Sequence, residues 1–278
     1  MFAHQVIEDL KKLKIPDSRY PKWEQKYREI VPDYINNSIK FHHPNMEIID
    51  KMAKLPRMLD VEKHFINNKD YIKLPYKNIW FDYVKPNNEH TSKYGLLVIS
   101  DSNDSELFSI HLFAFLCGFW QPQPRICYVN KSKNIIGVTT LKGVEKIIDD
   151  DSEDYILLQN SMANECLSFI NFILLLNCKN IGTETVPAPV KLNNKRKKKG
   201  KQPIFSYKTL VIKPTTKKEQ SIPKHLWNNR IHLARGHFKT YTEDKPLFGR
   251  ITGRFWWQPH VRGQNRDGVV MKDYKVEA

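Results

Sequence analysis

Two long apolar stretches constrain the fold of this chain more than any other feature of its sequence. They are "SELFSIHLFAFLCGFW" at 105–120 and "YILLQNSMANECLSFINFILLL" at 155–176. Such side chains leave water on folding, so the chain has to bury a sizeable core, and 40% hydrophobic residues can build one. The run "FINFILLLNC" at 169–178 is far shorter than the roughly 18–20 residues of a membrane-spanning helix. We therefore expect a soluble protein with no membrane partner.

The spacing of apolar residues changes along the chain. Val6, Ile7, Leu10 and Leu13 fall on one face of a helix in "HQVIEDLKKLKI", and "NMEIIDKMAKL" repeats this pattern. From residue 77 onward, short β-branched and aromatic stretches such as "KNIWFDYV" and "YGLLVISD" alternate with clusters of Asn, Pro, Asp and Ser. The beginning of the chain is therefore predicted to be mainly helical, and the part after it to contain strands.

The two apolar stretches lead to different predictions. The stretch at 155–176 follows the acidic run "DDDSEDY", whose Asp and Ser residues suit the N-terminal end of a helix, so we expect a capped, buried helix. A divalent metal held by these carboxylates is the less favoured alternative. The stretch at 105–120 is compatible with a buried helix or a buried strand, because periodicity alone does not separate them. We interpret His111 within it as a hydrogen-bonded core histidine.

These patterns together predict an α+β protein. The expected parts are a mainly helical N-terminal portion (1–75), a mixed α/β central region (76–186), a flexible basic loop (187–203) and an antiparallel β C-terminal region (204–278). Short turns containing Gly, Asp and Asn favour a meander in the last part. Its strand-like stretches are "IFSYKTLVI" (204–212), "RIHLARGHFKTY" (230–241), "GRFWWQPHVRG" (253–263) and "GVVMKDYKV" (268–276).

The four cysteines indicate a reducing compartment. Cys117, Cys127, Cys166 and Cys178 lie in apolar stretches and share no zinc-site or redox spacing. We interpret them as structural thiols, which favours a cytoplasmic protein. Neither a metal nor a cofactor is expected.

The positive charge is concentrated in the last third of the chain. Residues 191–278 hold 22 Lys and Arg against 6 Asp and Glu, a balance of +16, whereas residues 1–190 hold 23 against 24. A polyanion partner is favoured by such asymmetry, because phosphates bound by cations release condensed counterions. A solubilising basic tail is the alternative.

The segment "PAPVKLNNKRKKKGKQP" at 187–203 carries the densest charge. Like charges this close repel each other, so we expect an exposed and mobile loop. Such a run is typical of a nuclear-import signal, which needs a eukaryotic host, or of an arm that lies along phosphates. Its cations are Lys195, Arg196, Lys197, Lys198, Lys199 and Lys201.

Two of the C-terminal strands predict a polar patch. Side chains alternate across a strand, so Trp256 is expected on the polar face and Trp257 in the core with Phe255. If the two strands are antiparallel neighbours, their polar faces can coincide. The predicted patch consists of Arg235, His237, Lys239, Tyr241, Trp256, Gln258, His260 and Arg262.

Nucleic-acid binding is the function that this patch favours. Arg235, Lys239 and Arg262 would hold phosphates together with the loop cations, beside Gln258. Trp256 and Tyr241 would stack on unpaired bases, as in other platforms for single strands. RNA and DNA both remain possible partners.

Three alternatives remain for the same residues. His237 and His260 could act as base and acid of a metal-independent ribonuclease, with Tyr241 in the same site and cations on the phosphate. The protein could instead be a non-enzymatic inhibitor or adaptor that docks on an acidic host protein. A solvated sheet face without a function is the third.

The order of motifs in the last third resembles that of a family of bacteriophage- and prophage-encoded proteins. The motifs are "NNKRKKKGKQP", a strand with Tyr207, "HLARGHFKTY", "LFG", "WWQPHVRG" and "GVVMKDYKV", and "LPYKNIWFDY" adds a looser likeness earlier in the chain. The resemblance covers about residues 187–276. It implies a viral gene product in the cytoplasm of a bacterial host, where nucleic acids and host regulatory proteins are the usual targets. It implies no catalytic role for any residue.

Overall fold

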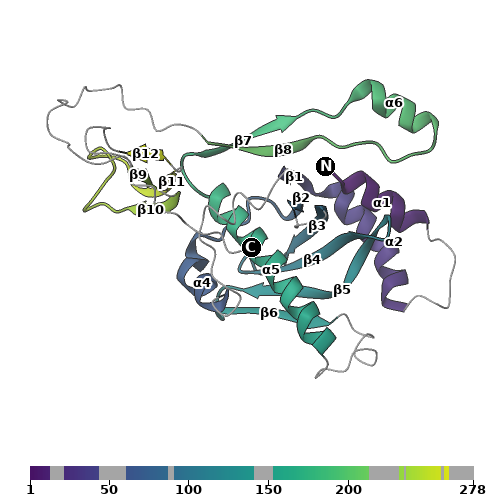
Figure 1. Ribbon diagram of the computed structural model, residues 1–278, viewed down its shortest axis with the longest axis horizontal. Coiled ribbons are helices and arrows are strands. Elements are labelled where there is room, and N and C mark those ends of the chain that lie inside the picture. Colours follow the sequence, from purple (N-terminus) through teal and green to yellow (C-terminus); the bar gives the residue numbers. More distant parts are fainter. Residues whose placement is uncertain are drawn as a thin grey trace.

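An eight-stranded mixed sheet with helices on both faces forms the centre of the protein (Figure 1). This arrangement confirms the predicted α+β class. A computed structural model gives the coordinates. It describes residues 1–12, 22–43, 61–86, 91–140, 153–212, 232–234, 236–257 and 260–262.

Most of the sheet is an antiparallel meander. The strand order is β6-β5-β4-β3-β2-β1-β8-β7, in which β1 is parallel to β2 and to β8 and the other neighbours are antiparallel. The strands are β1 (Ile39–His43), β2 (Asn78–Pro86), β3 (Thr91–Ser100), β4 (Leu107–Leu116), β5 (Phe119–Asn130), β6 (Ile135–Thr140), β7 (Ile181–Val186) and β8 (Tyr207–Ile212). The stretch at 204–212, expected in the C-terminal sheet, therefore supplies β8 of the main sheet instead.

Helices cover the two faces of the sheet unequally. α5 crosses one face, while α1 and α2 lie on the other (Figure 1). The helices are α1 (Ala3–Lys12), α2 (Lys22–Asn37), α4 (Val61–Asn68), the short 3-10 helix η2 (Lys69–Tyr71), α5 (Glu153–Leu176) and α6 (Val190–Lys198). α1 and α5 confirm two predicted helices. The expected helix in "NMEIIDKMAKL" and the capping residues 149–152 lie outside the described residues.

The apolar stretch at 105–120 forms a β-hairpin. β4 and β5 pair across a tight turn at Cys117 and Gly118, which have φ values of 52° and 88°. Two successive positive φ values characterise the turn whose twist suits a two-residue hairpin connection. Glycine adopts this conformation freely, so Gly118 favours a tight turn between β4 and β5. Cys117 is exposed at this turn, which corrects the expectation that all four cysteines have apolar surroundings.

Alternation along β2 divides its side chains between two cores. Phe81 and Tyr83 pack beneath α5, whereas Trp80 packs with α1 and α2. The indole of Trp80 lies directly over Gly95 on β3, where a Cβ atom would come within 2.4 Å of the ring. Only glycine therefore leaves room for this tryptophan at the centre of the sheet.

Asp82 is a fully buried carboxylate that joins α1 to the sheet. Its Oδ2 accepts hydrogen bonds from the backbone N–H of Phe2, at 2.6 Å, and from the indole N–H of Trp80, at 2.8 Å. Its Oδ1 lies 2.5 Å from Nδ1 of His42 on β1. A buried charge is tolerated only when donors satisfy it, and these three come from the start of α1, from β2 and from β1.

We predict that Asp82→Ala lowers the free energy of unfolding by about 3 kcal/mol, because one buried and two partly buried groups lose their partner. Urea unfolding measures the change. Asp33→Ala is the control, since Asp33 is exposed on α2 and its replacement should change stability by less than about 0.5 kcal/mol. Equal stability of the two variants would contradict the central role of Asp82.

Candidate nucleic-acid interface

The basic segment at 187–203 contains a regular helix. α6 spans Val190–Lys198 between β7 and β8, at the end of an arm that lies alongside α1 (Figure 1). The helix ends where Gly200 takes a φ of 64°, and the N–H groups of Gly200 and Lys201 bond to the carbonyls of Lys197 and Arg196. This is the hydrogen-bond pattern of a glycine-terminated helix. The segment expected to be an exposed, mobile loop is therefore a helix over 190–198.

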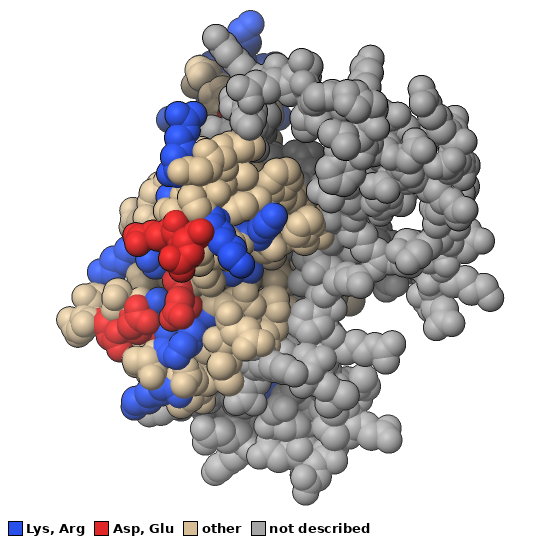
Figure 2. Space-filling model, turned by 90° about the vertical axis from the view of Figure 1, so that its left-hand side faces the viewer, with Lys and Arg blue, Asp and Glu red and all other residues tan. Residues whose placement is uncertain are grey.

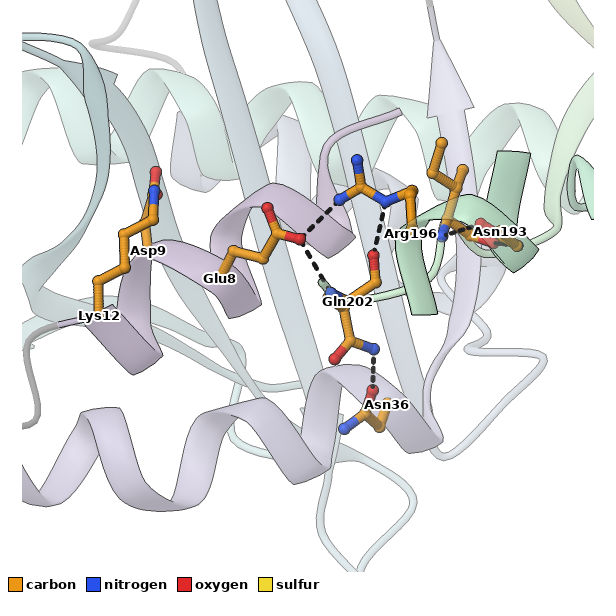
Figure 3. A network of polar contacts seen from close by, with 8 residues as sticks. Glu8, Asp9, Lys12, Asn36, Asn193, Arg196 and Gln202 are labelled. Carbon is orange, nitrogen blue, oxygen red and sulfur yellow. Dashed lines mark hydrogen bonds and ion pairs between the residues drawn. The ribbon is translucent and has the colours of Figure 1, made fainter. Parts of the chain in front are cut away.

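One face of α6 is bound to the rest of the protein. Asn193 is buried, and its amide both donates to the carbonyl of Ile204 and accepts from its N–H, each at 2.8 Å. Arg196 donates from Nε to the carbonyl of Gln202 at 2.8 Å and from Nη2 to Glu8 of α1 at 2.6 Å. Glu8 also accepts the backbone N–H of Gln202 at 2.9 Å. Figure 3 shows these contacts between α1, α6 and the returning chain.

The opposite face of α6 carries a row of lysines. Lys191, Lys195 and Lys198 are exposed and are spaced four and three residues apart, so they share one side of the helix. They lie about half a turn from Asn193 and Arg196 and extend over about 10 Å. We call these three residues the lysine stripe. None of them forms an ion pair with another residue that the structure describes.

Other cations extend the charge of the lysine stripe. Lys197, Lys199 and Lys201 are exposed as well, again without an ion pair among the described residues. Arg196 is the exception, because its guanidinium is committed to Glu8 and Gln202. The prediction of exposed cations thus holds for five of the six predicted residues, while Arg196 faces the protein. Lys191, which the sequence analysis left out, completes the stripe.

The C-terminal strands form an antiparallel hairpin. β10 (His237–Tyr241) pairs with β11 (Gly253–Trp257), and β9 (His232–Ala234) pairs with β12 (His260–Arg262). The antiparallel pairing expected of these stretches is therefore correct. The stretch at 268–276 lies outside the described residues.

The register of the hairpin corrects the predicted patch. His237 is opposite Trp257 and Phe238 is opposite Trp256, and residues paired in this way point to the same face. Trp256 therefore shares a face with Phe238, at 4.8 Å between ring centroids, and not with His237. The observed register differs by one residue from the one that the predicted patch requires. Such a shift moves every side chain of a strand to the opposite face relative to its neighbour.

Trp256, expected on the polar face, therefore lies in the core, whereas Trp257 shares a face with the buried Phe255 as expected but is itself partly exposed. Trp256 is only 5% exposed and belongs to the core beneath α5, and its backbone N–H and carbonyl both bond to the side chain of Asn180, at 2.9 and 2.6 Å. It is not placed to stack on a base. Trp257 is half-buried, and the same face carries His237, Lys239 and Tyr241. Lys239 Nζ lies 4.9 Å from the centroid of the Tyr241 ring.

Arg254 connects the hairpin to α4 and η2. Its guanidinium lies between the rings of Tyr71 and Phe238, at 4.5 and 4.4 Å from their centroids, and donates to Asn68 at 2.9 Å. Burial lowers the pKa of this arginine. The backbone carbonyl of Arg254 also accepts the N–H of Lys179. The first arginine of "RFWWQPHVRG" thus has a packing role.

The two histidines of the ribonuclease hypothesis are not opposite each other. His237 pairs with Trp257, and His260 pairs with Ala234, three positions along the hairpin or roughly 10 Å away. The structure describes only the backbone of His260 and Arg262, and Arg235 and Gln258 lie outside the described residues. The register of the hairpin therefore does not place His237 and His260 side by side.

The basic helix and the hairpin lie at opposite ends of the long axis of the molecule (Figure 1). They therefore do not form the continuous surface expected from the sequence. Figure 2 views the hairpin end, where acidic and basic side chains lie side by side on the described surface. In the sequence of the hairpin, the exposed acids Glu243 and Asp244 lie among the exposed cations Lys239, Lys245 and Arg250. The basic segment at 191–201 differs in that its seven cations have no acidic residue among them.

Other histidines take part in contacts that the sequence did not reveal. Nδ1 of His111 bonds to the hydroxyl of Tyr27, and its Nε2 lies 3.0 Å from Oγ of Ser109. This confirms the interpretation of a hydrogen-bonded core histidine, whose pKa burial lowers to about 4. His42 lies in β1 and contacts Asp82.

Comparisons with other proteins identify no relative. The chain matches no model of a known protein family, no curated protein and no solved structure. In the part of the chain that the structure describes, no three His, Cys, Asp or Glu side chains are grouped as for a metal ion. No helix there is long and apolar enough to span a membrane. The function of this protein therefore has to be inferred from the charges and contacts of its own residues.

We predict that Trp256→Ala lowers the free energy of unfolding by about 3–5 kcal/mol, as expected when a buried aromatic ring is removed. Trp257→Ala should cost roughly 1–2 kcal/mol, because its ring is half-buried. Urea unfolding of both variants gives the comparison. A larger loss for Trp257→Ala would contradict the register of the hairpin.

The lowered pKa of His111 predicts a loss of stability in acid. Between its folded value of about 4 and the usual value near 6.5, the unfolded chain binds a proton that the folded protein does not. Stability should therefore rise with pH across this window and fall as acid is added. His111→Gln should make the dependence of unfolding free energy on pH shallower there. Part of the dependence on pH should remain in this variant, because burial also lowers the pKa of His4 to about 4. An unchanged slope of unfolding free energy against pH in His111→Gln would contradict the prediction.

Proposed function

We propose that this protein binds nucleic acid through the lysine stripe of α6. The observation that carries the proposal is the contrast between the two faces of this helix. Asn193 and Arg196 bind the protein, while Lys191, Lys195 and Lys198 point away from it. Cations held in a row on a short, anchored helix suit contacts with successive phosphates, whose binding releases counterions.

The partner is proposed to be a nucleic acid because a repeating polyanion matches a repeating row of cations. Lysine contacts a phosphate as a point charge, and a phosphate contact carries no information on base identity. We therefore expect binding through the backbone, with little dependence on sequence. Docking on an acidic host protein uses the same charges, and the experiment below separates the two partners.

The hairpin supplies a second, weaker contact in this proposal. Lys239 and Tyr241 share a face with Trp257 and His237, which together offer a cation and aromatic rings. Aromatic side chains stack on unpaired bases without sequence preference. Trp257 takes the role that the sequence analysis gave to Trp256.

We predict that Lys191→Gln/Lys195→Gln/Lys198→Gln weakens binding of a labelled 30-base-pair DNA duplex roughly 100-fold near 0.1 M salt. The slope of log K against log salt should become shallower by about 2–3, because each lost phosphate contact contributes about 0.9. Fluorescence anisotropy between 50 and 200 mM salt measures both quantities. A single-stranded RNA of the same length gives the second arm.

The matched control is Lys73→Gln/Lys77→Gln/Lys133→Gln, which removes the same charge from exposed positions outside the arm. It should leave the slope nearly unchanged. Wild-type affinity that does not vary with salt, or an equal effect of both triple variants, would overturn the proposal. Wild-type protein that ignores both nucleic acids but binds an acidic protein would favour the adaptor, and metal-independent cleavage of the RNA would favour the ribonuclease.

A further inference from the structure

The geometry around α6 points to a positioning role for an acidic residue in this basic interface: we infer that Glu8 of α1 strengthens nucleic-acid binding by holding the lysine stripe in place through Arg196. This inference rests on the proposed function of α6. It assigns to Glu8 an effect opposite to that of its charge, since a carboxylate near a phosphate-binding surface otherwise opposes binding.

α6 needs an anchor because it does not form a stable helix by itself. A helix of nine residues is marginal in water even with a favourable sequence. Lys191 and Lys195 are also like charges four residues apart, and such pairs destabilise a helix. Lysines at its C-terminal end interact favourably with the helix dipole, but this effect is small at exposed positions. Most of its order must therefore come from contacts with its neighbours.

The side chains of Glu8 and Arg196 and the backbone of Gln202 supply this anchor between elements far apart in the sequence. Glu8 accepts from Arg196 Nη2 at 2.6 Å and from the N–H of Gln202 at 2.9 Å, across 188 and 194 residues. Arg196 Nε reaches the carbonyl of Gln202, and the Gln202 amide donates to Asn36 of α2 at 3.2 Å (Figure 3). We call the contacts of Glu8, Arg196 and Gln202 the α6 clamp.

The α6 clamp is sheltered from solvent. The side chains of Arg196 and Glu8 are 17% and 22% exposed, so the pair is less screened than an ion pair on the open surface. Arg196 uses two edges of its planar guanidinium at once, a geometry that lysine does not reproduce. Arg196 is thus a positioning residue, and the phosphate contacts belong to the lysines on the other face.

Glu8→Gln separates positioning from charge because the two effects have opposite signs. The variant makes the protein more positive by one unit, so electrostatics alone predicts tighter binding of the DNA duplex. Loss of the α6 clamp predicts weaker binding, because the nucleic acid then has to order the helix itself. We expect a three- to tenfold loss of affinity with an unchanged salt slope, since no phosphate contact is removed.

Arg196→Lys and Glu184→Gln complete the test. Arg196→Lys keeps the net charge and should also weaken binding. Glu184 is exposed on β7 of the same arm, and the structure gives it no contact with the clamp, so Glu184→Gln reports the effect of charge alone. It should leave affinity unchanged or raise it slightly.

Amide hydrogen exchange of the free protein provides a readout that does not depend on nucleic acid. Exchange across α6 should accelerate in Glu8→Gln and Arg196→Lys and stay at the wild-type rate in Glu184→Gln. Tighter binding by Glu8→Gln, or unchanged exchange in α6, would overturn the inference. Wild-type protein that binds no nucleic acid would instead refute the proposed function, and the exchange rates would still show whether the α6 clamp orders the helix.

Discussion

The buried carboxylate of Asp82 links the helical layer of this protein to its sheet. It accepts hydrogen bonds from Phe2 at the start of α1 and from Trp80 of β2, and it contacts His42 of β1. The N-terminal end of a helix favours a negative charge, so the site suits both the carboxylate and α1. α1 in turn carries Glu8, which holds α6 at the surface. α1 therefore connects the basic helix to the centre of the sheet, in addition to the strands β7 and β8 that flank α6.

The arm and the hairpin show two different uses of positive charge. In α6 the cations are separated by face, with Arg196 turned toward Glu8 and the lysine stripe turned outward. In the hairpin, Arg254 lies between two aromatic rings and fastens β11 to α4 and η2. Arginine suits such sites because its planar, weakly hydrated guanidinium stacks and donates at once. A net charge of +15 thus includes cations that serve packing as well as cations available to a partner.

The helices α1 and α5 could be predicted from the sequence because they depend on local patterns of apolar residues. The spacing of Val6, Ile7 and Leu10 is sufficient for α1, and the apolar composition of 155–176 is sufficient for α5. Local patterns did not predict which side chains of the two hairpin strands share a face. A shift of one residue in register decides whether Trp256 or Trp257 lies on the same face as His237. The α6 clamp joins residues 188 positions apart, and no local signal connects them. Gly200, just after the last helical residue, was an available sign that the basic segment contains a helix.

Chemical acetylation of lysines, read by mass spectrometry with and without a DNA duplex, tests the central claim most directly. The reagent modifies exposed amines, so a phosphate bound to a lysine protects it. We predict strong protection of Lys191, Lys195 and Lys198, with Lys73, Lys77 and Lys133 labelled equally in both samples. Equal labelling of the lysine stripe under conditions where the duplex is bound would contradict the account.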